Sequence, residues 1–297
     1  MAHSARRGRI PPGEMFPAGD PDYRVSFKKL RSGIRVRVIE RGSAVSPPVL
    51  FLPGWGSTVY IWRRNLPAIA DAGFHAFAVD LKGSGLSDKP LGEHEYTSDA
   101  LVNHVAEIID ALGLKKPVLV GHSQSALIAY RFAKRNPLRL RGLVLLSPVG
   151  HSGIKLLWLY KLLTPKMIRG ILPSLCTRLA IRITLRRVYG KLRTFSDRDV
   201  SEFHSPCYFP NFSIAQRDSL HAFDWKQPVE GRLDLPALVI HGTDDHLVRG
   251  ETLTDFEDAI PDIEAVVIEG AGHIVPEEAD EQVNAALIRF LRRIGPA

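Results

Sequence analysis

The chain has 297 residues, of which 45% are hydrophobic and 24% charged, with a formal net charge of +7. This length and balance are typical of a globular chain with a sizeable core, and they exclude a collagen-like, coiled-coil or wholly disordered chain. The positive charge suits anionic partners. We nevertheless expect no nucleic-acid partner, because the chain has no zinc-finger spacing and no RNA-binding motif.

The cysteines and the N-terminal residues bear on where in the cell the protein is expected. Cys176 and Cys207 are too few for a disulfide framework or a metal cluster, so we expect reduced thiols. Residues 1–21 are basic and rich in Pro and Gly, without an apolar run of signal-peptide length, and they indicate a flexible tail. No run of apolar residues is long enough to predict a transmembrane helix. We therefore expect a cytoplasmic protein.

The first predicted elements are two strands, Tyr23–Lys29 and Ile34–Ile39, joined by a turn at Gly33. In the second strand apolar residues alternate with arginines, the pattern of a strand with one buried face. We expect these strands to form an antiparallel hairpin at the edge of a sheet.

Six short apolar runs follow along the chain. Each is too short for a helix and lacks alternation, as expected for strands that are buried on both faces of a parallel sheet. Amphipathic helical patterns lie between them, such as Ser98–Leu112, and another closes the chain around residues 283–291. Strand alternating with helix predicts an α/β fold with a mostly parallel, doubly wound sheet. The six runs are Val49–Leu52, Ala76–Val79, Val118–Val120, Leu143–Leu146, Ala237–Ile240 and Ala265–Ile268.

The alternation is interrupted between residues 150 and 233, where the patterns are helical and rich in Leu, Ile, Lys and Arg. We predict a helical cap inserted into a core domain of residues 22–149 and 234–297. Its basic amphipathic stretches, Ile154–Lys166 and Leu175–Lys191, allow two interpretations. We favour helices that cover the site with their apolar faces inward. The alternative is a peripheral contact with an anionic membrane or an acidic carrier.

The strongest local motif is Gly-His-Ser-Gln-Ser at residues 121–125. It lies between the predicted strand Val118–Val120 and an apolar helical run that begins at Ala126. A serine at the apex of a strand–turn–helix unit is typical of a nucleophile elbow. Gly121 suits the close packing of such a turn, whereas Ser125 stands where a second glycine is usual. An ordinary Gly-Ser turn would give the same short pattern.

Acidic and histidine residues follow the last two predicted strands. A serine becomes a nucleophile near neutral pH when a histidine takes its proton and a carboxylate orients that histidine. Asp244 and Asp245 come after Ala237–Ile240, and His273 comes after Ala265–Ile268. Open α/β sheets bind ligands at these carboxyl ends of their strands. The residues thus follow the order Ser, Asp, His, and the residues alone leave Asp244 or Asp245 as the acid.

Together these motifs resemble the α/β-hydrolase family, in its esterase-like branch with a serine nucleophile, from about Tyr23 to the C-terminus. Residues 50–57 (LFLPGWGS) match the family's oxyanion loop, with Pro53 where a histidine is usual, and residues 78–88 (AVDLKGSGLSD) resemble its strand-to-loop signature. The resemblance places the acid three residues beyond Gly242, at Asp245. It implies an oxyanion hole formed by the backbone N–H groups of Trp55 and Gln124.

The resemblance implies a serine hydrolase with the catalytic triad Ser123, Asp245 and His273. Haloalkane dehalogenases and epoxide hydrolases of this fold carry an aspartate at the position of Ser123. We therefore expect cleavage of a carboxylester, lactone or thioester through an acyl-enzyme, with an apolar small-molecule acyl substrate and no metal or organic cofactor. The alternatives are a cofactor-free C–C hydrolase, lyase or acyltransferase with the same triad, or a non-catalytic ligand-binding protein.

Overall fold

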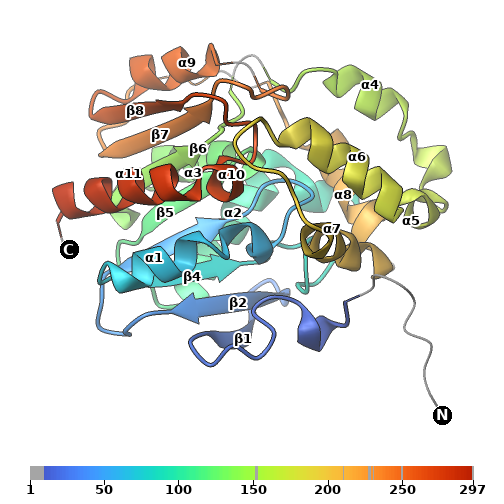
Figure 1. Cartoon of the computed structure of the whole chain (residues 1–297), viewed down its shortest axis with the longest axis horizontal. Coiled ribbons are helices and arrows are strands. Elements are labelled where there is room, and N and C mark those ends of the chain that lie inside the picture. The colour runs from blue at the N-terminus through green and yellow to red at the C-terminus, as the bar shows by residue number, and fades with distance from the viewer. Residues whose placement is uncertain are drawn as a thin grey trace.

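A computed structural model describes residues 10–150, 153–209, 211–226, 229, 231–248 and 250–295. Its centre is an eight-stranded sheet in the order β1-β2-β4-β3-β5-β6-β7-β8 (Figure 1). The pairs β1–β2 and β2–β4 are antiparallel and all other neighbouring pairs are parallel, which confirms the predicted mostly parallel α/β sheet. The strands are β1 Arg24–Lys29, β2 Arg35–Arg41, β3 Pro48–Leu52, β4 His75–Val79, β5 Val118–His122, β6 Gly142–Leu146, β7 Ala237–Gly242 and β8 Ile263–Ile268.

Helices cover both faces of the sheet and enclose two apolar cores. One core joins the sheet to α2 (Ser98–Ala111), α3 (Gln124–Arg135) and α9 (Thr252–Ala259). The other joins it to α1 (Asn65–Asp71) and α11 (Asp280–Arg293). The central strands β3 to β7 are buried on both faces, as their unbroken apolar runs predict.

Two strands differ from expectation. In β8, Val267 is 56% exposed, because β8 lies at the edge of the sheet and pairs only with β7. In β2, residues 36–40 are all buried, although alternation predicts one exposed face. Arg37, placed on that face by its spacing, is 3% exposed and lies 3.6 Å from Asp80.

The chain before the first strand accounts for the burial of Arg37. The Arg37 guanidinium donates to the carbonyl oxygen of Phe16, and the Phe16 N–H donates to Glu202 at 3.0 Å. Met15 is buried, and Ile10 donates its N–H to Ser205 at 3.1 Å. Residues 10–16 are therefore packed against the protein, contrary to the flexible tail predicted for 1–21. Residues 1–9 of that tail lie outside the described residues.

All the helices between β6 and β7 lie beyond the edge at which the parallel strands end (Figure 1). We call residues 150–233 the insertion, and its independence as a domain stays a prediction. Its described residues contain no strand of the sheet. The helices of the insertion are α4 Leu157–Leu162, α5 Leu172–Leu175, α6 Arg178–Val188, α7 Asp197–His204 and α8 Phe212–Ala222.

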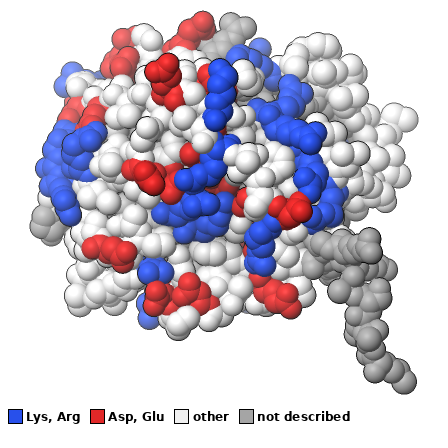
Figure 2. All heavy atoms as spheres, viewed as in Figure 1, with Lys and Arg blue, Asp and Glu red and all other residues white. Residues whose placement is uncertain are grey.

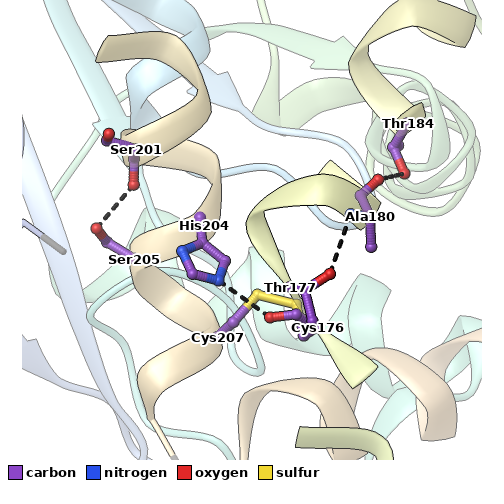
Figure 3. Close-up of a disulfide and its surroundings, with 8 residues drawn as sticks. All are labelled: Cys176, Thr177, Ala180, Thr184, Ser201, His204, Ser205 and Cys207. Carbon is purple, nitrogen blue, oxygen red and sulfur yellow. Dashed lines mark hydrogen bonds between the residues drawn. A yellow bond between two sulfur atoms is a disulfide. The ribbon is translucent and has the colours of Figure 1, made fainter. Parts of the chain in front are cut away.

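A disulfide joins Cys176, between α5 and α6, to Cys207, after α7 (Figure 3). The packing of α6 against α7 brings the two Cα atoms to 6.0 Å, and His204 contacts the carbonyl oxygen of Cys176 at 3.0 Å. The expectation of reduced thiols is therefore wrong. Because disulfides are typical of oxidising compartments, the predicted cytoplasmic location loses one of its supports. No helix among the described residues is long and apolar enough to cross a membrane.

The disulfide should stabilise the insertion. It closes a loop with a sequence separation of 31. Loop-closure entropy then predicts that replacing both cysteines by alanine lowers the free energy of unfolding by about 4 kcal/mol. Urea titrations with and without dithiothreitol measure this. The reductant should destabilise the wild type and leave the Cys176→Ala/Cys207→Ala variant unchanged; a wild type insensitive to reductant would contradict the prediction.

Candidate active site

Ser123 occupies a strained turn between β5 and α3. Its backbone has φ 55° and ψ −118°, a region that residues with a Cβ rarely adopt and that is typical of functional sites. Gly121 makes the turn possible, since a Cβ there would lie 2.4 Å from the carbonyl oxygen of Ser125. The strand, sharp turn and helix of the predicted nucleophile elbow are therefore present, with the Ser123 side chain at the apex of the turn.

The two departures from the family motifs contact each other. Ser125 is fully buried, and its hydroxyl donates a hydrogen bond of 2.5 Å to the carbonyl oxygen of Pro53. This bond ties the turn to the loop after β3, which a glycine at position 125 could not do. Gly54 follows in that loop, and a Cβ there would lie 3.0 Å from the Ser123 Cβ. The hydrogen bond between Ser125 and Pro53 thus holds the loop after β3 against Ser123.

Histidine and aspartate from neighbouring strand ends complete a chain of hydrogen bonds. His273 Nε2 lies 2.8 Å from Ser123 Oγ, and His273 Nδ1 lies 2.8 Å from Asp245 Oδ2. All three residues are 6% exposed. The second oxygen of Asp245 accepts the N–H groups of Leu247 and Val248 at 2.8 and 2.9 Å. Asp244 instead forms an ion pair with Lys191 at 2.9 Å, away from the histidine.

The environment keeps Asp245 ionised. Burial alone would raise the pKa of its carboxyl, but the charge of His273, its hydrogen bond and the Val248 N–H outweigh burial and lower the pKa to about 2. A carboxylate at this position fixes a proton on His273 Nδ1. Nε2 is then free to accept the proton of Ser123 Oγ.

His122, next to the serine, has a supporting role that the sequence did not reveal. Burial, and then the nearness of His273, lower its pKa to about 3, so the imidazole is neutral at ordinary pH. Its Nε2–H donates to the carbonyl oxygen of His273 at 2.9 Å. Because His122 is adjacent to Ser123 in the chain, this bond connects the backbones that carry the serine and the histidine.

The predicted oxyanion residues Trp55 and Gln124 line one small cavity together with Gly54. Gln124 is the first residue of α3, where helix N–H groups point outward and carry partial positive charge. Among the described residues, no acceptor pairs with the backbone N–H of Trp55 or of Gln124. Both groups are therefore available to an oxygen bound beside Ser123.

The insertion holds this loop through Gln216 of α8. The Gln216 carbonyl oxygen accepts the indole N–H of Trp55 at 2.9 Å. Its side-chain oxygen accepts the N–H of Gly56 at 2.8 Å, and its amide donates to the Gly83 carbonyl at 2.9 Å. No pattern in the sequence marks this glutamine.

The end of α6 holds the His273 loop in a similar way. The carbonyl oxygen of Val188 accepts the N–H of His273 at 2.7 Å. Glu278, in the short helix α10 (Val275–Glu278), is buried, and one of its oxygens accepts the N–H groups of Gly190 and Gly272 at 2.9 and 2.8 Å. The loop that carries the histidine is thus braced by a segment more than 80 residues earlier in the chain.

The space beside the predicted oxyanion residues is small. The cavity beside Trp55 and Gln124 has about 20 Å³, which holds roughly one water molecule. A larger hollow of about 680 Å³ lies beside Asp245, but neither Ser123 nor His273 lines it. An organic ligand is larger than the first cavity, and the second does not reach Ser123.

A buried serine at a strand-to-helix turn, hydrogen-bonded to a histidine and through it to a carboxylate, on a mostly parallel sheet, is the arrangement of an α/β-hydrolase. Residues 47–280 match the family model described as alpha/beta hydrolase fold, and the chain belongs to this family. The predicted fold is therefore confirmed.

Two proteins named as epoxide hydrolases and one named as a serine hydrolase are among those similar to this chain. Epoxide hydrolase A of Mycobacterium tuberculosis is 26% identical over 88% of this chain and 95% of its own length. An epoxide hydrolase mutant from Vigna radiata has a TM-score of 0.78, with 20% identity over 92% of this chain and 99% of that one. A serine hydrolase involved in carbazole degradation has a TM-score of 0.77, with 22% identity over 91% and 99%.

Proposed function

We propose that this chain is a serine hydrolase that cleaves an ester-like carboxyl derivative through an acyl-enzyme. The observation that carries the proposal is the pair of 2.8 Å hydrogen bonds that links Ser123, His273 and Asp245 in a buried site. In this proposal Ser123 is the nucleophile, His273 the general base and Asp245 the residue that orients and stabilises the imidazolium.

The steps balance with the chain's own groups and one water molecule. As Ser123 Oγ attacks the carbonyl carbon, its proton moves to His273 Nε2. The carbonyl oxygen becomes an oxyanion that accepts the N–H groups of Trp55 and Gln124. His273 returns the proton to the leaving alcohol, lactone oxygen or thiol, and an ester on Ser123 remains. Water then attacks that ester with His273 again as base, which releases the acid and restores the serine.

The names of the relatives favour epoxide hydrolysis as a second candidate, and the nucleophile argues against it. An aspartate that opens an epoxide forms an ester, which water can cleave at its carbonyl. Ser123 Oγ would instead form an ether with the epoxide carbon. An ether has no carbonyl for water to attack and no oxyanion to stabilise, so the enzyme would be blocked after one turnover. The serine therefore supports acyl transfer.

A fluorophosphonate probe tests the proposal directly, because it phosphonylates activated serines. We expect the wild type to be labelled at Ser123 and the Ser123→Ala variant to remain unlabelled, with the site read by peptide mass spectrometry. Ser147 is a matched control, since it is also buried, follows β6 and has a positive φ of 43°. Ser147→Ala should keep the label.

Two results would count against the proposal. An unlabelled wild type, or a label that persists in Ser123→Ala, would remove Ser123 as the nucleophile. Turnover of styrene oxide to its diol, without hydrolysis of any member of a p-nitrophenyl ester panel, would favour the epoxide candidate.

A further inference from the structure

Large apolar side chains are exposed mainly on the insertion. Ten of the seventeen exposed large apolar residues among the described part of the chain lie between residues 156 and 192. Trp158 is 66% exposed and Met167 is 92% exposed. Concentrations of this kind on a soluble domain mark a binding surface. The ten are Leu156, Trp158, Leu162, Leu163, Met167, Ile171, Leu175, Leu179, Ile183 and Leu192.

Eight of the ten, from Trp158 to Ile183, lie on α4, α5 and α6 or on the turns between them, and we call this surface the outer face. Leu156 comes directly before α4, and Leu192 follows α6. Other apolar residues of these helices turn inward: Leu157, Leu172 and Leu185 are buried, and Tyr160, Ile181 and Val188 are half-buried against the two cores. Seven apolar residues of the two amphipathic stretches are nevertheless exposed, so the interpretation that these stretches turn their apolar faces inward over the site is wrong for those seven. In Figure 1, α4 and α5 lie at the far end of the insertion from the sheet.

The charged side chains of residues 154–196 are all basic. Between residues 111 and 196 the sequence has no Asp or Glu, and residues 154–196 contain ten Lys and Arg. Arg186 and Arg187 are exposed, and no described acidic side chain pairs with either. Figure 2 shows basic side chains in a band over α6, beside an uncharged region where α4 and α5 lie. The ten are Lys155, Lys161, Lys166, Arg169, Arg178, Arg182, Arg186, Arg187, Lys191 and Arg193.

About half of these cations are paired with acids from elsewhere in the fold. The pairs include Arg169 with Asp218 at 2.7 Å and Lys191 with Asp244 at 2.9 Å. Every such acid lies outside the segment, so the helices themselves supply positive charge alone. Arg186 and Arg187 lie on α6 within four residues of the exposed Ile183. This combination of exposed Trp, Leu and Met with flanking Lys and Arg is typical of helices that lie in a membrane interface.

We propose that the outer face binds the surface of an anionic lipid membrane. The basic residues would contact lipid phosphates and carboxylates, while Trp158, Leu162 and their neighbours enter the boundary between headgroups and acyl chains. A second copy of this chain is a poorer occupant, because pairing through the outer face would set like charges against each other. The proposal goes beyond the proposed hydrolase function and does not depend on it, since binding is measured without turnover.

Vesicle flotation with the full chain tests the proposal. We compare vesicles of pure phosphatidylcholine with vesicles that contain about 30% phosphatidylserine. The protein should float with the anionic vesicles and much less with the neutral ones. Raising the salt from about 0.1 M to about 1 M shortens the Debye length and should weaken binding severalfold. The control for folding is the circular dichroism and thermal unfolding of each variant.

Two pairs of variants separate the apolar and the basic contributions. Trp158→Ser/Leu162→Ser should lower the partition coefficient by about tenfold or more, because both side chains would otherwise leave water. Its matched control is Val45→Ser/Leu138→Ser, two residues that are 95% and 84% exposed outside the insertion.

Arg186→Ser/Arg187→Ser should weaken binding by a similar factor and reduce its salt dependence. Lys29→Ser/Lys115→Ser removes two exposed cations outside the insertion and should have little effect.

Three outcomes would overturn the proposal. The first is no binding to anionic vesicles. The second is binding that the outer-face variants leave unchanged. The third is a failure to bind vesicles that is accompanied by another interaction of the outer face. Binding to polyglutamate would then assign the outer face to an acidic protein. A concentration-dependent dimer in analytical ultracentrifugation that Trp158→Ser/Leu162→Ser abolishes would assign it to a second copy.

Discussion

Ser123→Ala is expected to lower kcat for hydrolysis of a reactive ester by about 10⁶-fold, the scale seen when a triad nucleophile is removed. The physical reason is that the remaining groups can bind the ester and stabilise an oxyanion but cannot form the acyl-enzyme. A residual rate above that of water should persist, because the Trp55 and Gln124 N–H groups are unchanged. Stopped assays with p-nitrophenyl acetate measure both rates.

The strained backbone of Ser123 also predicts that a substitution which abolishes activity can raise the stability of the protein. Its positive φ of 55° strains a residue that has a Cβ, and such strain is worth about 1–3 kcal/mol. Glycine adopts this conformation freely, at some entropic cost in the unfolded chain. Ser123→Gly should therefore be inactive and about 1 kcal/mol more stable than Ser123→Ala in urea unfolding. An active or less stable Ser123→Gly would show that the strained turn does not serve the nucleophile.

Asp245→Asn is expected to lower kcat by about 10⁴-fold, because an amide favours the wrong tautomer of the histidine. The neighbouring Asp244 provides a control of the same chemistry. Its carboxylate pairs with Lys191 and does not contact His273, so Asp244→Asn should change kcat less than about twofold, within the range of exposed ion pairs. Equal losses in the two variants would contradict the assignment of the acid.

Asp245 also predicts a dependence of stability on pH. Its folded pKa of about 2 lies below the ordinary value of 3.8, so the unfolded state takes up a proton first as the pH falls. The resulting stabilisation, about 2 kcal/mol, is fully present above pH 4 and is lost between about pH 4 and pH 2. The difference in unfolding free energy between wild type and Asp245→Asn should shrink over that interval. Parallel curves would contradict the lowered pKa.

Much of the fold can be predicted from the sequence because central strands of a parallel sheet leave a strong signal. The runs at residues 49–52 and 143–146 are apolar without interruption, since helices cover both faces. The candidate site is predictable for the same reason. Ser123, Asp245 and His273 each follow a strand by a few residues, and the parallel order of β5, β6, β7 and β8 brings their ends to one edge.

What the sequence does not reveal depends on contacts between distant segments. Gln216 and Glu278 bind backbone groups, and such contacts leave no motif. The pairing of Cys176 with Cys207 depends on how α6 packs against α7. Periodicity identifies the amphipathic helices of the insertion but not which of their faces meets the protein, so the outer face could not be predicted. The buried Arg37 depends likewise on residues 10–16, which have no strong local pattern.

Two of the contacts between the insertion and the core differ in what their release would do to Ser123, His273 and Asp245. Freeing the end of α6 would take away the Val188 carbonyl that accepts the N–H of His273, and His273 would lose one of the contacts that hold it. Freeing Gln216 would release Trp55 and Gly83 and leave the hydrogen bonds among Ser123, His273 and Asp245 in place. An opening that begins at α8 would therefore leave these three hydrogen-bonded residues in place, whereas an opening that begins at α6 would remove a contact of His273.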